Sequence, residues 1–187
     1  MQAADADVCR RVYAYLTIRY PEGALEEVEN ALRLNPRSIP LAKARIEVLA
    51  ALGQENAMLA CWQELIAHAP EQKQDRELLE EMAWGIIRKG TESSNPLTVA
   101  LALLAAQKGQ DVRGVRLLAA GMRHPNSAIR ALTVDLVSQM RDVTLQNELV
   151  RLIAQDKVWA VRLEAIRAIG RMKMREAQGF LEHILSD

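Results

Sequence analysis

Residues 156–170 read DKVWAVRLEAIRAIG and carry the clearest structural pattern in the chain. Apolar side chains recur there at spacings of three and four residues, at Val161, Ala165, Ala168 and Ile169. This spacing places them on one stripe of an α-helix. A helix with such a stripe has to bury it against other helices, so the segment predicts a fold of packed helices.

The surrounding sequence repeats this unit with a period of about 31 residues, which is typical of helical repeat arrays. Asp111-Val112 recurs one period later as Asp142-Val143, and Ile129-Arg130 recurs as Val161-Arg162. A second apolar stripe lies within 126–140, formed by Ile129, Leu132, Thr133, Leu136, Val137 and Met140. Because one helical hairpin cannot cover such a face, neighbouring units have to stack and share a continuous core.

The C-terminal repeat resembles the HEAT repeat family over residues 96–187, and most closely over 142–171. In that family an Asp in the turn between two helices and an Arg early in the second helix form a hydrogen-bonded ladder from repeat to repeat. The resemblance therefore implies a ladder made by Asp156, Arg130 and Arg162.

The N-terminal half repeats with a longer period. Leu34-Asn35-Pro36 recurs as His68-Ala69-Pro70, and Ala24-Leu25 recurs at the same distance as Met58-Leu59. This distance is the period of the tetratricopeptide repeat, about 34 residues, and residues 3–70 resemble that family. The resemblance places Tyr15, Ala24 and Ala31 at family positions, whereas the signature Trp and Leu-Gly of the first helix are absent.

Helical periodicity runs almost from end to end, and Pro and Gly mark the breaks. We predict eleven helices, at 4–19, 23–34, 38–52, 55–68, 72–89, 96–107, 111–123, 126–140, 142–155, 158–171 and 174–186. Short connections make consecutive helices antiparallel. The predicted fold is an all-α solenoid of helical hairpins, similar to armadillo-like superhelices.

We expect two regions, with tetratricopeptide-like hairpins in 1–90 and HEAT-like repeats in 91–187. The longest polar break, from Gly90 to Pro96, is the predicted junction. The helix at 72–89 can belong to either array, and both regions are expected to form one continuous superhelix.

The end of the sequence falls inside a repeat unit. Asp187 stands one repeat period after Asp156, at the turn where a second helix would begin. We therefore expect the chain to be a fragment of a longer repeat protein. The apolar side of the helix at 174–186 would then be partly uncovered.

Composition excludes several classes of protein. Of 187 residues, 50% are hydrophobic and 26% charged, with 24 basic and 24 acidic residues, which is too apolar for intrinsic disorder. No apolar run approaches the roughly 20 residues of a membrane-spanning helix, and the N-terminus lacks a signal-peptide pattern. We predict a cytoplasmic protein. Cys9 and Cys61 show no metal-binding spacing and are predicted to be buried thiols.

The sequence offers no catalytic constellation. His68, His124 and His183 fall in three different repeat units, without an H-E-x-x-H pattern. His124 takes the place of Asp156 one repeat earlier, so we expect it to cap a helix rather than bind a metal. Nucleophile-elbow and phosphate-loop motifs are also absent. We predict a protein that is not an enzyme and has no metal, no cofactor and no small-molecule substrate.

Solenoids of both families typically present a surface to a peptide or folded partner. The resemblance therefore implies a non-enzymatic scaffold that binds a protein or peptide, whose identity the sequence does not give. Asp135 with Arg167 and Gln139 with Arg171 occupy equivalent repeat positions away from the apolar stripes. We predict that these four residues face the partner, although ordinary solvated helix surface is the alternative.

The alternative function is nucleic-acid binding by the arginine-rich C-terminal half. Arginines outnumber lysines 18 to 6 in the chain, and HEAT-like DNA glycosylases show that such solenoids can bind DNA. Acidic residues are interspersed among the arginines, however, and single-strand binding also needs stacking aromatics. In 91–187 the aromatics are Trp159 and Phe180, and Trp159 is expected to pack between repeats.

Overall fold

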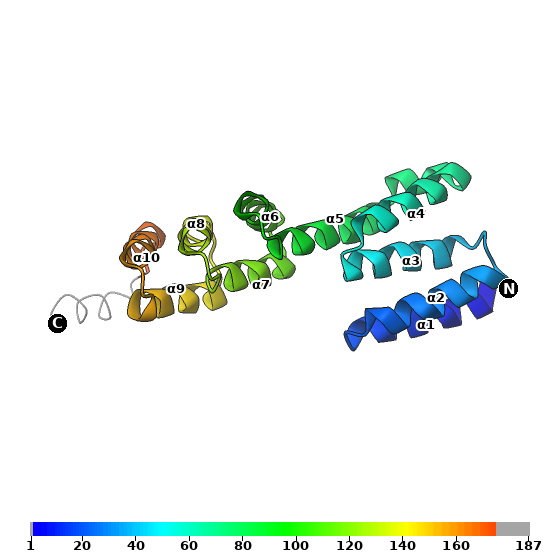
Figure 1. Ribbon diagram of the computed structural model, residues 1–187, viewed down its shortest axis with the longest axis horizontal. Coiled ribbons are helices and arrows are strands. Elements are labelled where there is room, and N and C mark those ends of the chain that lie inside the picture. The colour runs from blue at the N-terminus through cyan, green and yellow to red at the C-terminus, as the bar shows by residue number, and fades with distance from the viewer. Residues whose placement is uncertain (1, 175–187) are drawn as a thin grey trace. The chain divides into compact units, whose positions relative to one another are not determined.

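The computed structural model describes residues 2–174, which form ten α-helices and one 3₁₀ helix and contain no β-strand (Figure 1). The helices are α1 (Gln2–Thr17), α2 (Pro21–Leu34), α3 (Ile39–Leu52), α4 (Glu55–His68), η1 (Pro70–Gln74), α5 (Arg76–Thr91), α6 (Pro96–Lys108), α7 (Val112–Gly121), α8 (Ser127–Val137), α9 (Val143–Gln155) and α10 (Trp159–Met172). Among them, none has the length and apolar character needed to cross a membrane. The predicted all-α class is confirmed. Beyond Met174, the helix predicted at 174–186 lies outside the described residues.

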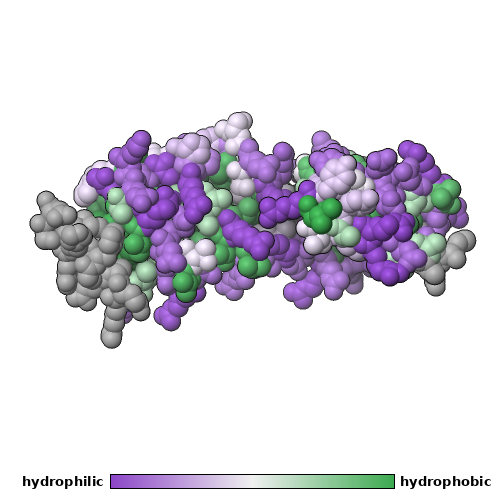
Figure 2. All heavy atoms as spheres, turned by 90° about the horizontal axis from the view of Figure 1, so that it is seen from below, coloured by the Kyte–Doolittle hydropathy of each residue, from purple (hydrophilic) through white to green (hydrophobic). Residues whose placement is uncertain are grey.

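The chain divides into two compact units between Lys89 and Gly90. We call them the N-terminal unit (1–89) and the C-terminal unit (90–187). On the face seen in Figure 2, hydrophilic side chains predominate, and hydrophobic ones appear in small separate groups. The apolar side chains that hold each unit together are buried between its helices.

Two helical hairpins make up most of the N-terminal unit. α1 packs against α2 and α3 against α4, while α3 also contacts α1 and α2. One apolar cluster joins α1, α2 and α3, and its fully buried members include Val12, Val28 and Leu41. A second cluster joins α3, α4 and α5 around Met58 and Leu78. Sequential pairing of helices with a shared core is the arrangement of a repeat solenoid.

The two hairpins end in the same backbone geometry. Asn35 follows α2 with φ −134° and ψ 74°, and Ala69 follows α4 with φ −136° and ψ 75°. Each donates its N–H to a carbonyl four residues earlier, at 3.0 Å for Asn35 to Ala31 and 2.8 Å for Ala69 to Leu65. The period that the sequence shows between Pro36 and Pro70 is therefore also a period of the backbone.

The predicted helix at 72–89 was wrong at both ends. The 3₁₀ helix stops at Gln74, and α5 starts after Asp75, whose carboxylate accepts the Leu78 N–H at 3.1 Å and pairs with Lys43. At the other end α5 continues through Gly90, which we had interpreted as a helix break. A Cβ at Gly90 would lie 2.9 Å from Ala102 Cβ, so the glycine permits the close approach of this last turn to α6.

The C-terminal unit places its helices in two rows. Figure 1 shows α6, α8 and α10 along one side and α7 and α9 along the other. α10 contacts α8 and α9, and α6 contacts α7 and α8. One continuous apolar cluster runs through all five helices, including Leu103, Leu118, Val134, Leu149 and Ile169. Stacked hairpins with an unbroken core are what the stripes in 126–140 and 158–171 predicted.

α8 is shorter than the predicted helix at 126–140. It ends at Val137, and the next residues form a tight turn in which Met140 N–H donates to Val137 O at 2.8 Å. Ser138 Oγ also donates to Asp135 O, at 2.6 Å, which takes up one of the carbonyls at the helix end. Gln139 therefore lies in a turn and not on the helix where we expected it.

Candidate protein-interaction surface

The turns before α8 and α10 are built alike. Asp156 Oδ1 accepts the Val158 N–H at 2.9 Å, and His124 Nδ1 accepts the Asn126 N–H at 3.1 Å. Arg162 Nη1 donates to Asp156 O at 3.0 Å, and Arg130 Nη1 donates to His124 O at 2.8 Å. Asp156 and His124 thus occupy equivalent positions, as the sequence predicted.

His124 does not itself cap α8, however. Asn126 is the capping residue, because its Oδ1 accepts the Ala128 N–H at 2.9 Å. His124 instead fixes the turn through the Asn126 N–H. The prediction that His124 caps a helix was therefore wrong, because Asn126 of the same turn caps α8.

A buried ion pair joins these two turns. Arg130 donates from Nε and Nη2 to the two carboxylate oxygens of Asp156, at 2.7 and 2.8 Å. The side chains are only 14% and 4% exposed, respectively. The hydrogen bond from Arg130 holds the pKa of Asp156 below its usual value. The structure thus brings together the three ladder residues, with Arg130 on the carboxylate and Arg162 on the backbone carbonyl of Asp156.

A second link between repeats, which we did not predict, centres on Glu148 of α9. Its carboxylate, 10% exposed, accepts from Arg123 and from Arg151 Nε, the latter at 2.7 Å. The hydrogen bond from Arg123 is the main cause that lowers the pKa of Glu148. The sequence did contain a signal for this link. Glu148 is the one charged residue among the buried residues of α9, so its position alone indicated that it needs a cationic partner.

Trp159 does not pack between repeats in the described part of the chain, so that prediction was wrong. Its side chain is 61% exposed, and the Arg162 guanidinium carbon lies 5.4 Å from its ring centroid. Trp159 is the first residue of α10 and precedes Val161 by two positions, about 200° around the helix axis from the buried stripe. Its position on the helix therefore directs it away from the core.

Three of the four predicted partner-facing residues meet on the exposed side of α8 and α10. Arg171 Nη2 contacts Asp135 Oδ1 at 3.1 Å and Glu164 Oε1 at 2.8 Å. Arg167 Nη1 lies 3.6 Å from Glu164 Oε2. Glu164 was missed by the sequence reasoning, although its spacing of three and seven residues from the two arginines places all three on one face of α10.

Next to this charged network lies a cavity of about 520 Å³, between the end of α8, the start of α9 and the end of α10. It is lined by Ser138, Gln139, Met140, Arg141, Gln146, Arg171, Met172, Lys173 and Met174. Gln139 and Arg171 thus share one concave surface. Arg171 is paired with Asp135 and Glu164, so Arg141 and Lys173 give this surface its positive charge. Its three methionines are flexible apolar side chains that adapt to different shapes.

Metal sites require particular arrangements of ligating side chains, and the two histidines among the described residues, 2–174, are His68 and His124. No group of three or more His, Cys, Asp or Glu side chains within the described part of the chain is arranged to hold a metal ion. His68 Nδ1 is hydrogen-bonded to its own helix, at Glu64 O, and His124 is hydrogen-bonded in its turn. The charged network on α8 and α10 is suited to recognition by charge.

The comparison with known protein families gives a match in the region that contains this surface. Residues 115–187 match a family model described as HEAT repeats, which includes most of α7 and all of α8, α9 and α10. No curated protein and no solved structure matches the chain. The comparisons give no support for tetratricopeptide-like repeats in the N-terminal half, and the match begins after α6. Residues 115–187 of this all-α chain carry HEAT repeats.

Proposed function

We propose that the C-terminal unit binds a protein or peptide partner through the exposed side of α8 and α10. HEAT-repeat domains typically mediate protein interactions. The observation that carries the proposal is the charged network around Arg171, which adjoins a concave surface lined by methionines and by Arg141 and Lys173. We further propose that this role is non-enzymatic.

The exposure of the network supports a role in recognition. The Arg171 and Asp135 side chains are 44% and 55% exposed, and ion pairs of that kind contribute only about 0 to 1 kcal/mol to stability. Their charges are therefore available for exchange with charges on a partner. Since the adjoining cavity is cationic, we expect the partner to present an acidic segment with apolar side chains beside it.

Affinity capture with charge-reversed variants tests this proposal. The full chain and its Arg171→Glu variant are used to capture proteins from cells of the source organism, followed by mass spectrometry. The control is Arg116→Glu, which reverses an exposed arginine on α7, in the other row of helices. We expect the control and the unmodified chain to capture the same partner, and Arg171→Glu to lose it. Equal capture by both variants would contradict the proposal.

A second candidate, nucleic-acid binding, is favoured by one observation, the exposed Trp159 with Arg162 over its ring. Exposed aromatic and guanidinium planes can stack on unpaired bases. Against it, Arg123, Arg130, Arg151 and Arg171 are already paired with carboxylates. Fluorescence polarisation with single-stranded DNA at low and at physiological salt separates the candidates. Micromolar affinity that falls steeply with salt and is lost in Trp159→Ala would favour nucleic acid.

A further inference from the structure

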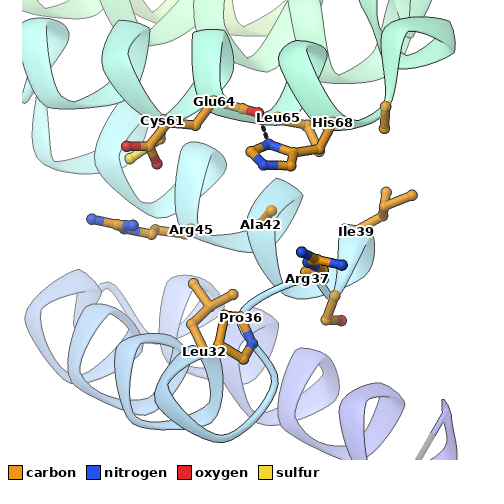
Figure 3. Close-up of a pocket in the computed structure, with 12 residues that line it drawn as sticks. Leu32, Pro36, Arg37, Ile39, Ala42, Arg45, Cys61, Glu64, Leu65 and His68 are labelled. Atoms are coloured by element: carbon orange, nitrogen blue, oxygen red, sulfur yellow. Dashed lines mark hydrogen bonds between the residues drawn. The ribbon is translucent and has the colours of Figure 1, made fainter.

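A second concave site lies in the N-terminal unit, between α2, α3 and α4 (Figure 3). Its volume is about 620 Å³, within the range of pockets that bind small organic molecules. The comparisons assign nothing to this part of the chain, and the sequence predicted no small-molecule substrate. The pocket depends on three helices that share no motif, so only the fold reveals it.

The two ends of this pocket differ in charge. Figure 3 shows Arg45 below Glu64 toward one end and Arg37 with His68 toward the other. Arg45 also approaches Glu29, with 3.9 Å between Nη2 and Oε1, so its charge is partly balanced. Arg37 makes no ion pair with any described residue, and both Arg37 and His68 are exposed. The end formed by Arg37 and His68 is therefore the cationic end.

The orientation of His68 directs its second nitrogen outward from its helix. His68 Nδ1 lies 2.8 Å from Glu64 O, and because a carbonyl oxygen only accepts, Nδ1 carries the hydrogen. Nε2 is left to contact a ligand, as an acceptor in the neutral ring or as a donor in the protonated ring. An anion at this end would meet the Arg37 guanidinium and the Nε2 side of the His68 ring.

The rest of the lining is mostly apolar. It is formed by Leu32 and Pro36 beside α2, by Ile39 and Ala42 of α3, and by Leu65 and Ala69 at the end of α4. A strongly hydrated ion gains nothing from such walls, whereas an aliphatic chain gains roughly 25 cal/mol for each Å² of apolar surface removed from water. The pocket therefore combines an anion-binding end with a space for a short hydrocarbon chain.

We propose that this pocket binds a medium-chain aliphatic carboxylate, with the carboxylate between Arg37 and His68 and the chain along Leu32, Ala42 and Leu65. A planar guanidinium matches a carboxylate with two parallel hydrogen bonds. This site is separate from the surface proposed on α8 and α10.

Octanoate is the probe for the first experiment, which uses the unmodified full chain and isothermal titration calorimetry. The matched ligands are octanol, octylammonium and acetate, which change the head group or remove the chain. Octanoate is expected to bind saturably, with at least about tenfold higher affinity than octanol or acetate, because a hydrogen bond to a charged group is worth about one factor of ten or more. Octylammonium is expected not to bind.

Variants then locate the binding to this pocket. Arg37→Gln removes the unbalanced charge and Ala42→Leu fills the apolar part, and each is expected to weaken octanoate binding at least about tenfold. Arg37 also lines a neighbouring cavity against α1, whereas Ala42 lines the proposed pocket and not that cavity. The control is Arg33→Gln, an exposed arginine of α2 that donates to Asn30 and does not line the pocket.

Three results would overturn the proposal: no saturable octanoate binding, equal affinity for octanol and octanoate, or equal weakening by Arg37→Gln and Arg33→Gln. Circular dichroism and thermal unfolding of each variant show whether it is folded. Arg37 is exposed and makes no ion pair within the described residues, so its replacement does not disturb the fold. If Ala42→Leu fails to fold, the ligand series and Arg37→Gln still decide the question.

Discussion

The two units connect their successive hairpins with different chemistry. In the C-terminal unit, a buried guanidinium and carboxylate join the turns at Arg130 and Asp156. In the N-terminal unit, the Asp5 carboxylate accepts from two uncharged donors, Asn35 Nδ2 and Ser38 Oγ, at 2.8 and 2.7 Å. A buried charge has to keep its partner, because an unpaired one is costly. The chain thus joins these hairpins through an ion pair in the region that matches the HEAT-repeat model, and through uncharged donors outside that match.

Breaking the buried pair is expected to have the largest effect. Asp156→Ala leaves the Arg130 guanidinium without its carboxylate at a site where both are largely buried, and should lower the free energy of unfolding by about 3 kcal/mol. Urea unfolding followed by circular dichroism measures this. The control is Asp142→Ala, which removes only the cap of α9 and should cost about 1 kcal/mol. Similar losses of unfolding free energy in the two variants would show that the buried ion pair contributes no more to stability than the helix cap does.

Adding a methyl group at a helix contact sharpens the comparison between the units. A Cβ at Gly85 would lie 2.8 Å from Ala50 O, which is backbone, and Gly85→Ala should lower the free energy of unfolding by about 2 kcal/mol. In the C-terminal unit, a Cβ at Gly121 would meet side-chain atoms of Thr133 and Leu103 rather than backbone. Gly121→Ala should stay within about 1 kcal/mol of the unmodified protein. Thermal and urea unfolding measure the stability of both variants. A larger loss in Gly121→Ala than in Gly85→Ala would contradict the prediction.

The contributions of Asp156 and Glu47 to the pH dependence of stability should differ in sign. The folded pKa of Asp156 is lowered by Arg130, so its contribution is present above the unfolded pKa, near 3.9, and is lost as the pH falls through the folded value. Burial raises the folded pKa of Glu47, so its contribution is present at low pH and is lost as the pH rises through the folded value.

Urea unfolding at pH 7, 5 and 3 measures this contrast. The stability difference between the unmodified protein and Asp156→Ala should shrink toward pH 3. Glu47→Gln should gain stability relative to the unmodified protein as the pH rises from 3 to 7. Parallel pH profiles of the unmodified protein and both variants would contradict these directions.

The smallest effect is expected at Trp159. Because its ring is 61% exposed and its main contact is Arg162, Trp159→Ala should change the free energy of unfolding by less than about 1 kcal/mol. Trp84 of α5, 7% exposed, is the contrasting case, and Trp84→Ala should cost about 3 kcal/mol. Urea unfolding of both variants tests the contrast. A large loss at Trp159 would mean that it packs against part of the chain after all.

The fold could be predicted from the sequence because apolar periodicity and turn residues act locally. The stripe of Val161, Ala165 and Ile169 is buried as expected. Gly90 was interpreted wrongly because the sequence shows a residue that permits a break, and not the Ala102 methyl group that needs the space.

The candidate site could be predicted only in part. Asp135, Arg167 and Arg171 were found from repeat equivalence, whereas Glu164, which contacts both arginines, was missed because it has no charged equivalent among the compared repeat positions. The pocket of the N-terminal unit depends on side chains from α2, α3 and α4, so no local pattern could reveal it.

The turn at Asp156 is held from two sides, through its carboxylate by the preceding repeat and through its carbonyl by its own. In a linear array, such a residue supplies the nearest-neighbour coupling that makes repeats unfold together. Loss of structure in α8 removes Arg130 from the turn, and the Asp156 carboxylate, which accepts the Val158 N–H, then loses the guanidinium that holds it. Amide exchange at Val158, whose N–H is bound to Asp156, should therefore report on the opening of both repeats at once.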